Sequence, residues 1–98
     1  MAFIQIIDFE TDRFDEVRAL VDDYRTSTQD RRTAQRGILT KSRDGENRYV
    51  NIVFFDSYEE AMKNSEMPET SAFAEQMMKL CTGPATFSNL DVVLDETL

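Results

Sequence analysis

The sequence predicts an α+β protein in which a four-stranded antiparallel sheet carries helices on one face. The first observation is the order of the periodic segments, which runs strand, helix, strand, strand, two helices, strand. The second is that the first and third strands are apolar on both faces, whereas one layer of helices covers only one face of a sheet. We therefore expect the other face to require a second sheet.

The first strand and the first helix are predicted from a change of periodicity. Residues 2–9 alternate as a strand does, with Phe3, Ile7 and Phe9 on one face and Ile4 and Ile6 on the other. After two good capping residues the period becomes helical, which predicts a helix from about residue 12 to residue 26. The caps are Thr11 and Asp12, and the apolar stripe is Phe14, Val17, Leu20, Val21 and Tyr24.

A hairpin follows a polar loop. Residues 34–43 and 48–55 have strand composition and flank the tetrapeptide 44–47, whose Asp44–Gly45 step is a strong hairpin signal. A short second helix is expected next, since Ser57 has a glutamate, Glu60, at the offset that a capping box needs. This helix should end near Ser65.

The last part of the chain predicts a third helix and a closing strand. Pro68 suits a helix start, and Gly83–Pro84 stops the helix. Between them lies an apolar stripe of Phe73, Met77 and Leu80, which we expect to be buried. Residues 85–94 form the closing strand, whose second face is interrupted by Asn89 and Asp91. The whole order corresponds to a ferredoxin-like α+β sandwich, one domain over residues 1–98.

Composition narrows the functional classes. The 98 residues are 41% hydrophobic, and 19 acidic against 11 basic residues give a net charge of -8, which opposes binding to nucleic acid or anionic lipid. No apolar run reaches the roughly 20 residues of a membrane span, and no signal peptide is visible, so we expect a cytoplasmic protein. Cys81 is the single cysteine, and no histidine is present, so the usual Cys/His metal spacings and the commonest general base are absent.

One stretch resembles a known family. Residues 49–65 (YVNIVFFDSYEEAMKNS), followed by Pro68 and residues 73–75 (FAE), resemble the antibiotic biosynthesis monooxygenase-like domains of the dimeric α+β barrel superfamily. The resemblance implies a homodimer in which two protomers pack sheet against sheet, covering the second apolar face. It also implies a cleft for a small apolar or aromatic molecule between each protomer's helices and its own sheet.

The resemblance also implies candidate site residues. Family members that oxidise quinols or polycyclic aromatics use neither metal nor flavin, so no cofactor is expected, and the protein positions the substrate and favours its anion. Catalytic candidates are the Asn51 amide and Tyr49 hydroxyl as donors and Arg36 as a cation. Residues expected to bind the substrate are Val53 and Phe55 on the same strand face, Tyr58 at the rim, and Phe73 and Met77 opposite.

The same sequence features bear on three alternatives to this enzyme. Haem-degrading members of the family have Trp and His at the positions that match Phe55 and Met77 here. They also have an Asn on the first strand, where this sequence has only Gln5 as a nearby amide, and these differences disfavour haem degradation. A dimeric protein that binds a small hydrophobic molecule without turning it over fits the same features. Residues 48–55 faintly resemble the third strand of RNA-recognition domains, but they lack its glycine and middle aromatic, and the net charge opposes RNA binding.

Overall fold

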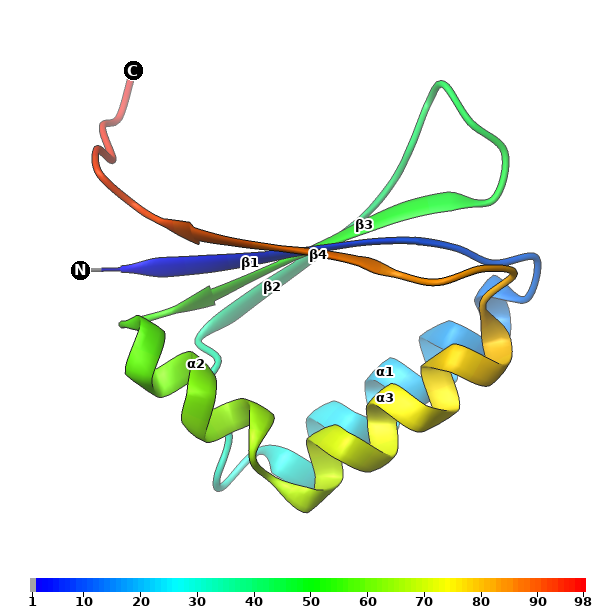
Figure 1. Cartoon of the computed structure of the whole chain (residues 1–98), viewed down its shortest axis with the longest axis horizontal. Coiled ribbons are helices and arrows are strands. Elements are labelled where there is room, and N and C mark those ends of the chain that lie inside the picture. Colours follow the sequence, from blue (N-terminus) through cyan, green and yellow to red (C-terminus); the bar gives the residue numbers. More distant parts are fainter. Residues whose placement is uncertain (1) are drawn as a thin grey trace.

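The computed structural model describes residues 2–98 and shows one sheet with its helices on a single side (Figure 1). The strands are β1 (Phe3–Glu10), β2 (Arg36–Lys41), β3 (Arg48–Phe55) and β4 (Thr86–Asp91). The helices are α1 (Phe14–Thr28), α2 (Tyr58–Ser65) and α3 (Pro68–Leu80). The order of elements is the predicted one.

The sheet has the strand order β2-β3-β1-β4, and every neighbouring pair is antiparallel. This is the predicted ferredoxin-like arrangement, with β1 and β3 in the centre. In their register Phe3 lies opposite Phe55, and Phe9 lies opposite Tyr49. Because side chains alternate along a strand, these four aromatic residues share the side that the helices cover, called here the helix face.

Two local expectations at the start of α1 were wrong. The helix begins at Phe14, two residues later than predicted, and its capping position is Arg13, which makes no side-chain cap. The fully buried Thr11 serves another contact, since its hydroxyl donates to the Leu80 carbonyl at 2.6 Å and accepts the Arg13 N–H at 3.0 Å. Thr11 therefore ties the end of α3 to the entry of α1.

The hairpin and the closing strand also differ in detail from the expectation. Asn47, with φ of 59°, takes the left-handed backbone conformation of the loop, whereas Gly45 does not. Asparagine tolerates this region better than most residues, so the loop needs no glycine there. The predicted strands 34–43 and 85–94 shorten to Arg36–Lys41 and Thr86–Asp91.

The core lies on the helix face in two separate clusters. The α2 cluster consists of Phe3, Phe55 and Ala61, all at most 4% exposed. The α1 cluster consists of Phe9, Val17 and Tyr49, all at most 6% exposed. Each cluster occupies one end of the β1–β3 pair, so the middle of the helix face lies between two buried ends.

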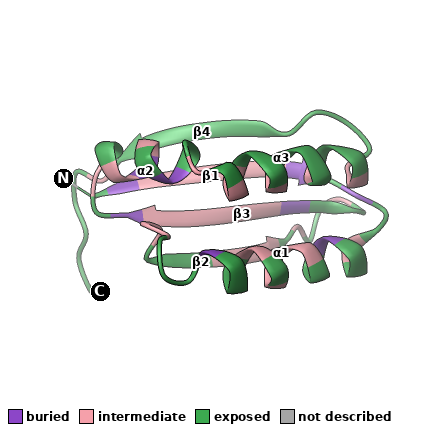
Figure 2. Ribbon diagram, turned by 90° about the horizontal axis from the view of Figure 1, so that it is seen from below, coloured by how far each residue is buried: buried purple, intermediate pink, exposed green. Residues whose placement is uncertain are grey.

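The expectation that the α3 stripe is buried was only partly right. Phe73, Met77 and Leu80 are half-buried, no residue of α3 is fully buried, and Met78 is 77% exposed. The reason is that α3 packs beside α1, whereas the neighbouring strand β4 is exposed along its whole length (Figure 2).

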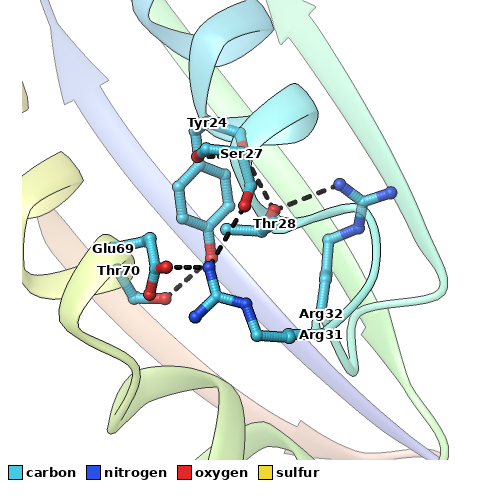
Figure 3. A network of polar contacts seen from close by, with 7 residues as sticks. All are labelled: Tyr24, Ser27, Thr28, Arg31, Arg32, Glu69 and Thr70. Atoms are coloured by element: carbon cyan, nitrogen blue, oxygen red, sulfur yellow. Dashed lines mark hydrogen bonds and ion pairs between the residues drawn. The ribbon is translucent and has the colours of Figure 1, made fainter.

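A polar network holds the helices together where α1 ends and α3 begins (Figure 3). The Tyr24 hydroxyl lies 2.8 Å from Thr70 Oγ1 and accepts the Asn64 amide at 3.1 Å. Arg31 forms an ion pair with Glu69 beside it. These contacts fix the three helices to one another at the point farthest from the sheet.

The opposite side of the sheet, called here the open face, carries no helix (Figure 1). Ile4 and Ile6 of β1 and Ile52 and Phe54 of β3 point to this side and remain half-exposed. Across residues 2–98, no helix has the length and apolar character needed to span a membrane.

Candidate functional site

The centre of the helix face is the candidate site. The alternation of β3 places Tyr49, Asn51, Val53 and Phe55 there, as the sequence predicted. Tyr49 and Phe55 are buried within the two clusters, while Asn51 and Val53 between them are half-buried. The accessible part of this row is therefore its middle.

Asn51 is the polar residue in the middle of that row. Its side-chain amide has no hydrogen-bond partner within residues 2–98, and neither of its polar atoms is fully buried. A half-buried amide among apolar neighbours loses free energy unless a ligand or water satisfies it. Asn51 is thus a donor and acceptor available to a bound molecule.

Tyr49 and Phe55 lie at the two ends of this row, each within a buried cluster. The Tyr49 ring stacks on Phe14 at 4.6 Å between centroids and on Phe9 at 5.7 Å. Phe55 packs at 6.3 Å from Phe3 and contacts Ala61. Both rings are core residues in the structure, at 6% and 4% exposed, and their contact with a substrate stays a prediction.

Arg36 does not join the other two catalytic candidates. It lies opposite Phe54 in the β2–β3 register, and its guanidinium sits 5.5 Å from the centre of the Phe54 ring. Phe54 belongs to the open face, so Arg36 and Asn51 are on opposite sides of the sheet. Strand alternation decides this, because Arg36 is an odd number of residues from the helix-face positions of β2.

Phe73 and Met77 come from α3, as predicted, and both have packing partners. The Phe73 ring lies 4.7 Å from the Tyr24 ring, and Met77 packs against the α1 cluster. Val53 packs against the α2 cluster. All three are half-buried, so each combines core contacts with some accessible surface.

Tyr58, predicted to lie at the rim of the cleft, follows the N-cap of α2 and packs beside Phe3. Its ring is 50% exposed and meets Phe3 edge-on at 5.6 Å. It helps to line a surface depression, called here the β4 hollow, between the start of α2 and strand β4. The hollow is lined by Phe3, Ser57, Tyr58, Glu59, Asn89 and Asp91.

The sequence analysis named Gln5 and Asn89 separately but missed that their amides pair beside this hollow. Gln5 and Asn89 lie opposite each other in the β1–β4 register, and Gln5 Nε2 donates to Asn89 Oδ1 at 3.2 Å. Each amide interrupts the apolar pattern of its strand face, which identifies the residues but not their pairing. Their pairing depends on the β1–β4 strand register, which cannot be read from the sequence.

Two properties of the ionisable groups in the described residues bear on catalysis: metal-binding clusters and shifted pKa values. In the part of the chain that the structure describes, no three His, Cys, Asp or Glu side chains come close enough to hold a metal ion. Burial raises the pKa of the Cys81 thiol, which disfavours the thiolate. The pKa of Arg48 is raised by its hydrogen bond to Glu10 and by the charge of Asp8, so this cation stays charged.

Comparison with known proteins identifies the fold. No family model and no curated protein matches the sequence. Among solved structures, SnoaB, a cofactor-independent oxygenase from Streptomyces nogalater, is 17% identical, with 99% of this chain and 96% of that chain covered and a TM-score of 0.80. Rv0793 from Mycobacterium tuberculosis is 23% identical over the full length of both chains, with a TM-score of 0.79.

A third similar structure is a candidate antibiotic biosynthesis monooxygenase from Caulobacter crescentus. It is 14% identical, covers 95% of this chain and 91% of its own, and has a TM-score of 0.83. The chain thus has the fold of antibiotic biosynthesis monooxygenase-like proteins, as the resemblance in residues 49–65 predicted. Identities this low establish the fold alone.

Proposed function

We propose that this protein is a cytoplasmic, homodimeric, cofactor-independent monooxygenase acting on a phenolic, quinol-like or polycyclic aromatic compound. The observation that carries the proposal is the unpartnered Asn51 amide at the centre of the helix face. The fold shared with SnoaB, itself a cofactor-independent oxygenase, supports the same activity.

The chemistry relies on the substrate more than on the protein. An easily ionised substrate passes electrons to O₂; one oxygen atom enters the substrate, and the other leaves as water with the two hydrogens that the substrate gives up. Asn51 would donate a hydrogen bond to the substrate oxygen, where negative charge develops. The buried clusters on both sides would keep water from the reacting carbon.

Oxygen uptake with a panel of quinols and anthrones tests the activity. We expect uptake by the wild type and a loss of about 10- to 100-fold in Asn51→Ala, because one hydrogen bond to a developing anion is removed. Gln29→Ala, which truncates an exposed amide at the end of α1, is the matched control. An unchanged rate in Asn51→Ala would remove Asn51 from the mechanism.

The alternative is a dimeric protein that binds such a molecule without oxidising it. It is favoured because Arg36, the one cation among the predicted catalytic residues, lies on the opposite face of the sheet from Asn51. Native mass spectrometry of gently purified protein reports both the dimer and any ligand carried with it. A retained ligand that stays unchanged in air would support the binding protein, and its oxidation would support the enzyme.

A further inference from the structure

The β4 hollow, the amide pair and Asn51 lie in successive rows of the helix face. Asn89 belongs to both, because it lines the hollow and accepts a hydrogen bond from Gln5. Asn51 lies opposite Ile7, and Gln5 is two residues before Ile7 on β1. Diagonal neighbours of this kind have Cα atoms about 7–8 Å apart, which a planar bicyclic or tricyclic molecule spans.

The amide pair leaves a defined set of hydrogen-bonding groups free. The bond between them uses one Gln5 N–H and one lone pair of Asn89 Oδ1. Gln5 Oε1 remains as an acceptor and the Asn89 NH₂ group remains as a donor. The matching ligand edge has a donor next to an acceptor, as in a lactam or a hydroxyl beside a carbonyl.

The charge around the hollow selects against anions. Glu59 and Asp91 line it, and neither forms an ion pair within residues 2–98. No basic side chain lines the hollow. A carboxylate ligand would therefore meet uncompensated negative charge at this point.

We propose that the β4 hollow is the entrance to the binding site and that Asn89, paired with Gln5, is a specificity-determining residue there. The ligand is a neutral planar molecule with a hydrogen-bond donor next to a carbonyl on one edge. This inference rests on the proposed function for the existence of a ligand at Asn51. It adds the route by which the ligand enters and the edge of the ligand that the amide pair recognises.

Fluorescence titration with three matched probes tests the recognised edge. Phenanthridinone carries the lactam edge, its N-methyl derivative lacks the donor, and a carboxylated phenanthridinone adds a negative charge. We expect the parent lactam to bind about 5-fold or more tightly than the N-methyl probe and about 10-fold more tightly than the carboxylate. Equal affinity for the three probes, or no binding of the lactam, would overturn the inference.

Variants separate this inference from the proposed function. Asn89→Leu removes the amide at an exposed strand position, and Asn89→Asp keeps the acceptor toward Gln5 but loses the donor. Both should bind phenanthridinone about 5-fold or more weakly, with Gln29→Leu as the matched control.

Comparing lactam binding by the Asn89 variants and by Asn51→Leu decides whether the entrance at the β4 hollow or the site at Asn51 fails. Loss of lactam binding in Asn51→Leu but not in the Asn89 variants would overturn the entrance and leave the site at Asn51. Loss in the Asn89 variants but not in Asn51→Leu would support the recognised edge and count against the proposed catalytic position. No loss in either would overturn both.

Discussion

The two faces of the sheet have similar apolar content and different surroundings. On the helix face, Phe3, Phe9, Tyr49 and Phe55 are at most 6% exposed, because α1 and α2 cover them. On the open face, Ile4, Ile6, Ile52 and Phe54 are only half-buried, since no element of the described chain lies over them. The helix face stabilises the monomer, and the open face is apolar surface left for a partner.

The helix face is also uneven along its length. Its two ends are closed by buried clusters, and its centre carries the amides of Gln5 and Asn51 with partial exposure. A continuous apolar core would have been more stable than a core divided by amides. The division is what favours a binding role for the centre.

The largest effect is expected from opening the α1 cluster. Phe9→Ala should lower the free energy of unfolding by about 3–5 kcal/mol, since a buried ring is replaced by a cavity beside Val17 and Tyr49. Urea denaturation followed by circular dichroism measures this. A loss below about 1 kcal/mol would show that this end of the core is loosely packed.

The next effect concerns the open face. Ile52→Asp should convert the proposed dimer to a monomer, with the dissociation constant raised by at least about 100-fold, because each interface would bury an unpaired carboxylate. Light scattering coupled to gel filtration reports the mass, and unchanged far-ultraviolet circular dichroism would show that the helix face is intact. A wild-type monomer, or a variant that stays dimeric, would contradict the assignment of this face.

A smaller effect is expected at the polar network of the helices. Tyr24→Phe should cost about 1–3 kcal/mol, because it leaves Asn64 and Thr70 without the shared hydroxyl. Tyr58→Phe is the matched control, since that ring is half-exposed and should change stability by less than about 0.5 kcal/mol. Equal losses in the two variants would mean that the network contributes nothing specific.

The smallest effect is chemical. Because burial raises the pKa of Cys81, its thiolate fraction at a given pH is lower in the folded chain than in the unfolded chain. Reaction with a thiol reagent at pH 8 should be slower for the native protein than for the protein unfolded in urea. The reaction rate of the native protein should also begin to rise at a higher pH than that of the unfolded protein. A native thiol that reacts faster than the unfolded one would point to an activated cysteine instead.

Much of the fold could be predicted from local patterns. The β3 bounds, the Ser57–Glu60 cap of α2 at 3.2 Å and the Pro68 start of α3 all follow from residues close together in the sequence. The N-terminus of α1 was misplaced because Thr11 bonds Leu80, a residue distant in sequence. Tertiary contacts of this kind override a local capping preference.

The candidate site was predictable only where it depends on residues close together in the sequence. Alternation along one strand correctly grouped Asn51 with Val53, but Arg36 comes from another strand, and its face depends on register. The Gln5–Asn89 pair joins residues 84 positions apart, so no local pattern contains it.

By itself, the sequence determined the order of strands and helices and the absence of histidine. It also determined that the first and third strands are apolar on both faces and that Asn51 lies in the middle of its strand. These properties depend on periodicity and composition, which act over a few neighbouring residues. Only the tertiary structure decided which apolar face the helices cover, which aromatic rings close the two ends of the core and which amides meet across the sheet. Those outcomes depend on strand register and helix docking, which bring together residues that are far apart along the chain.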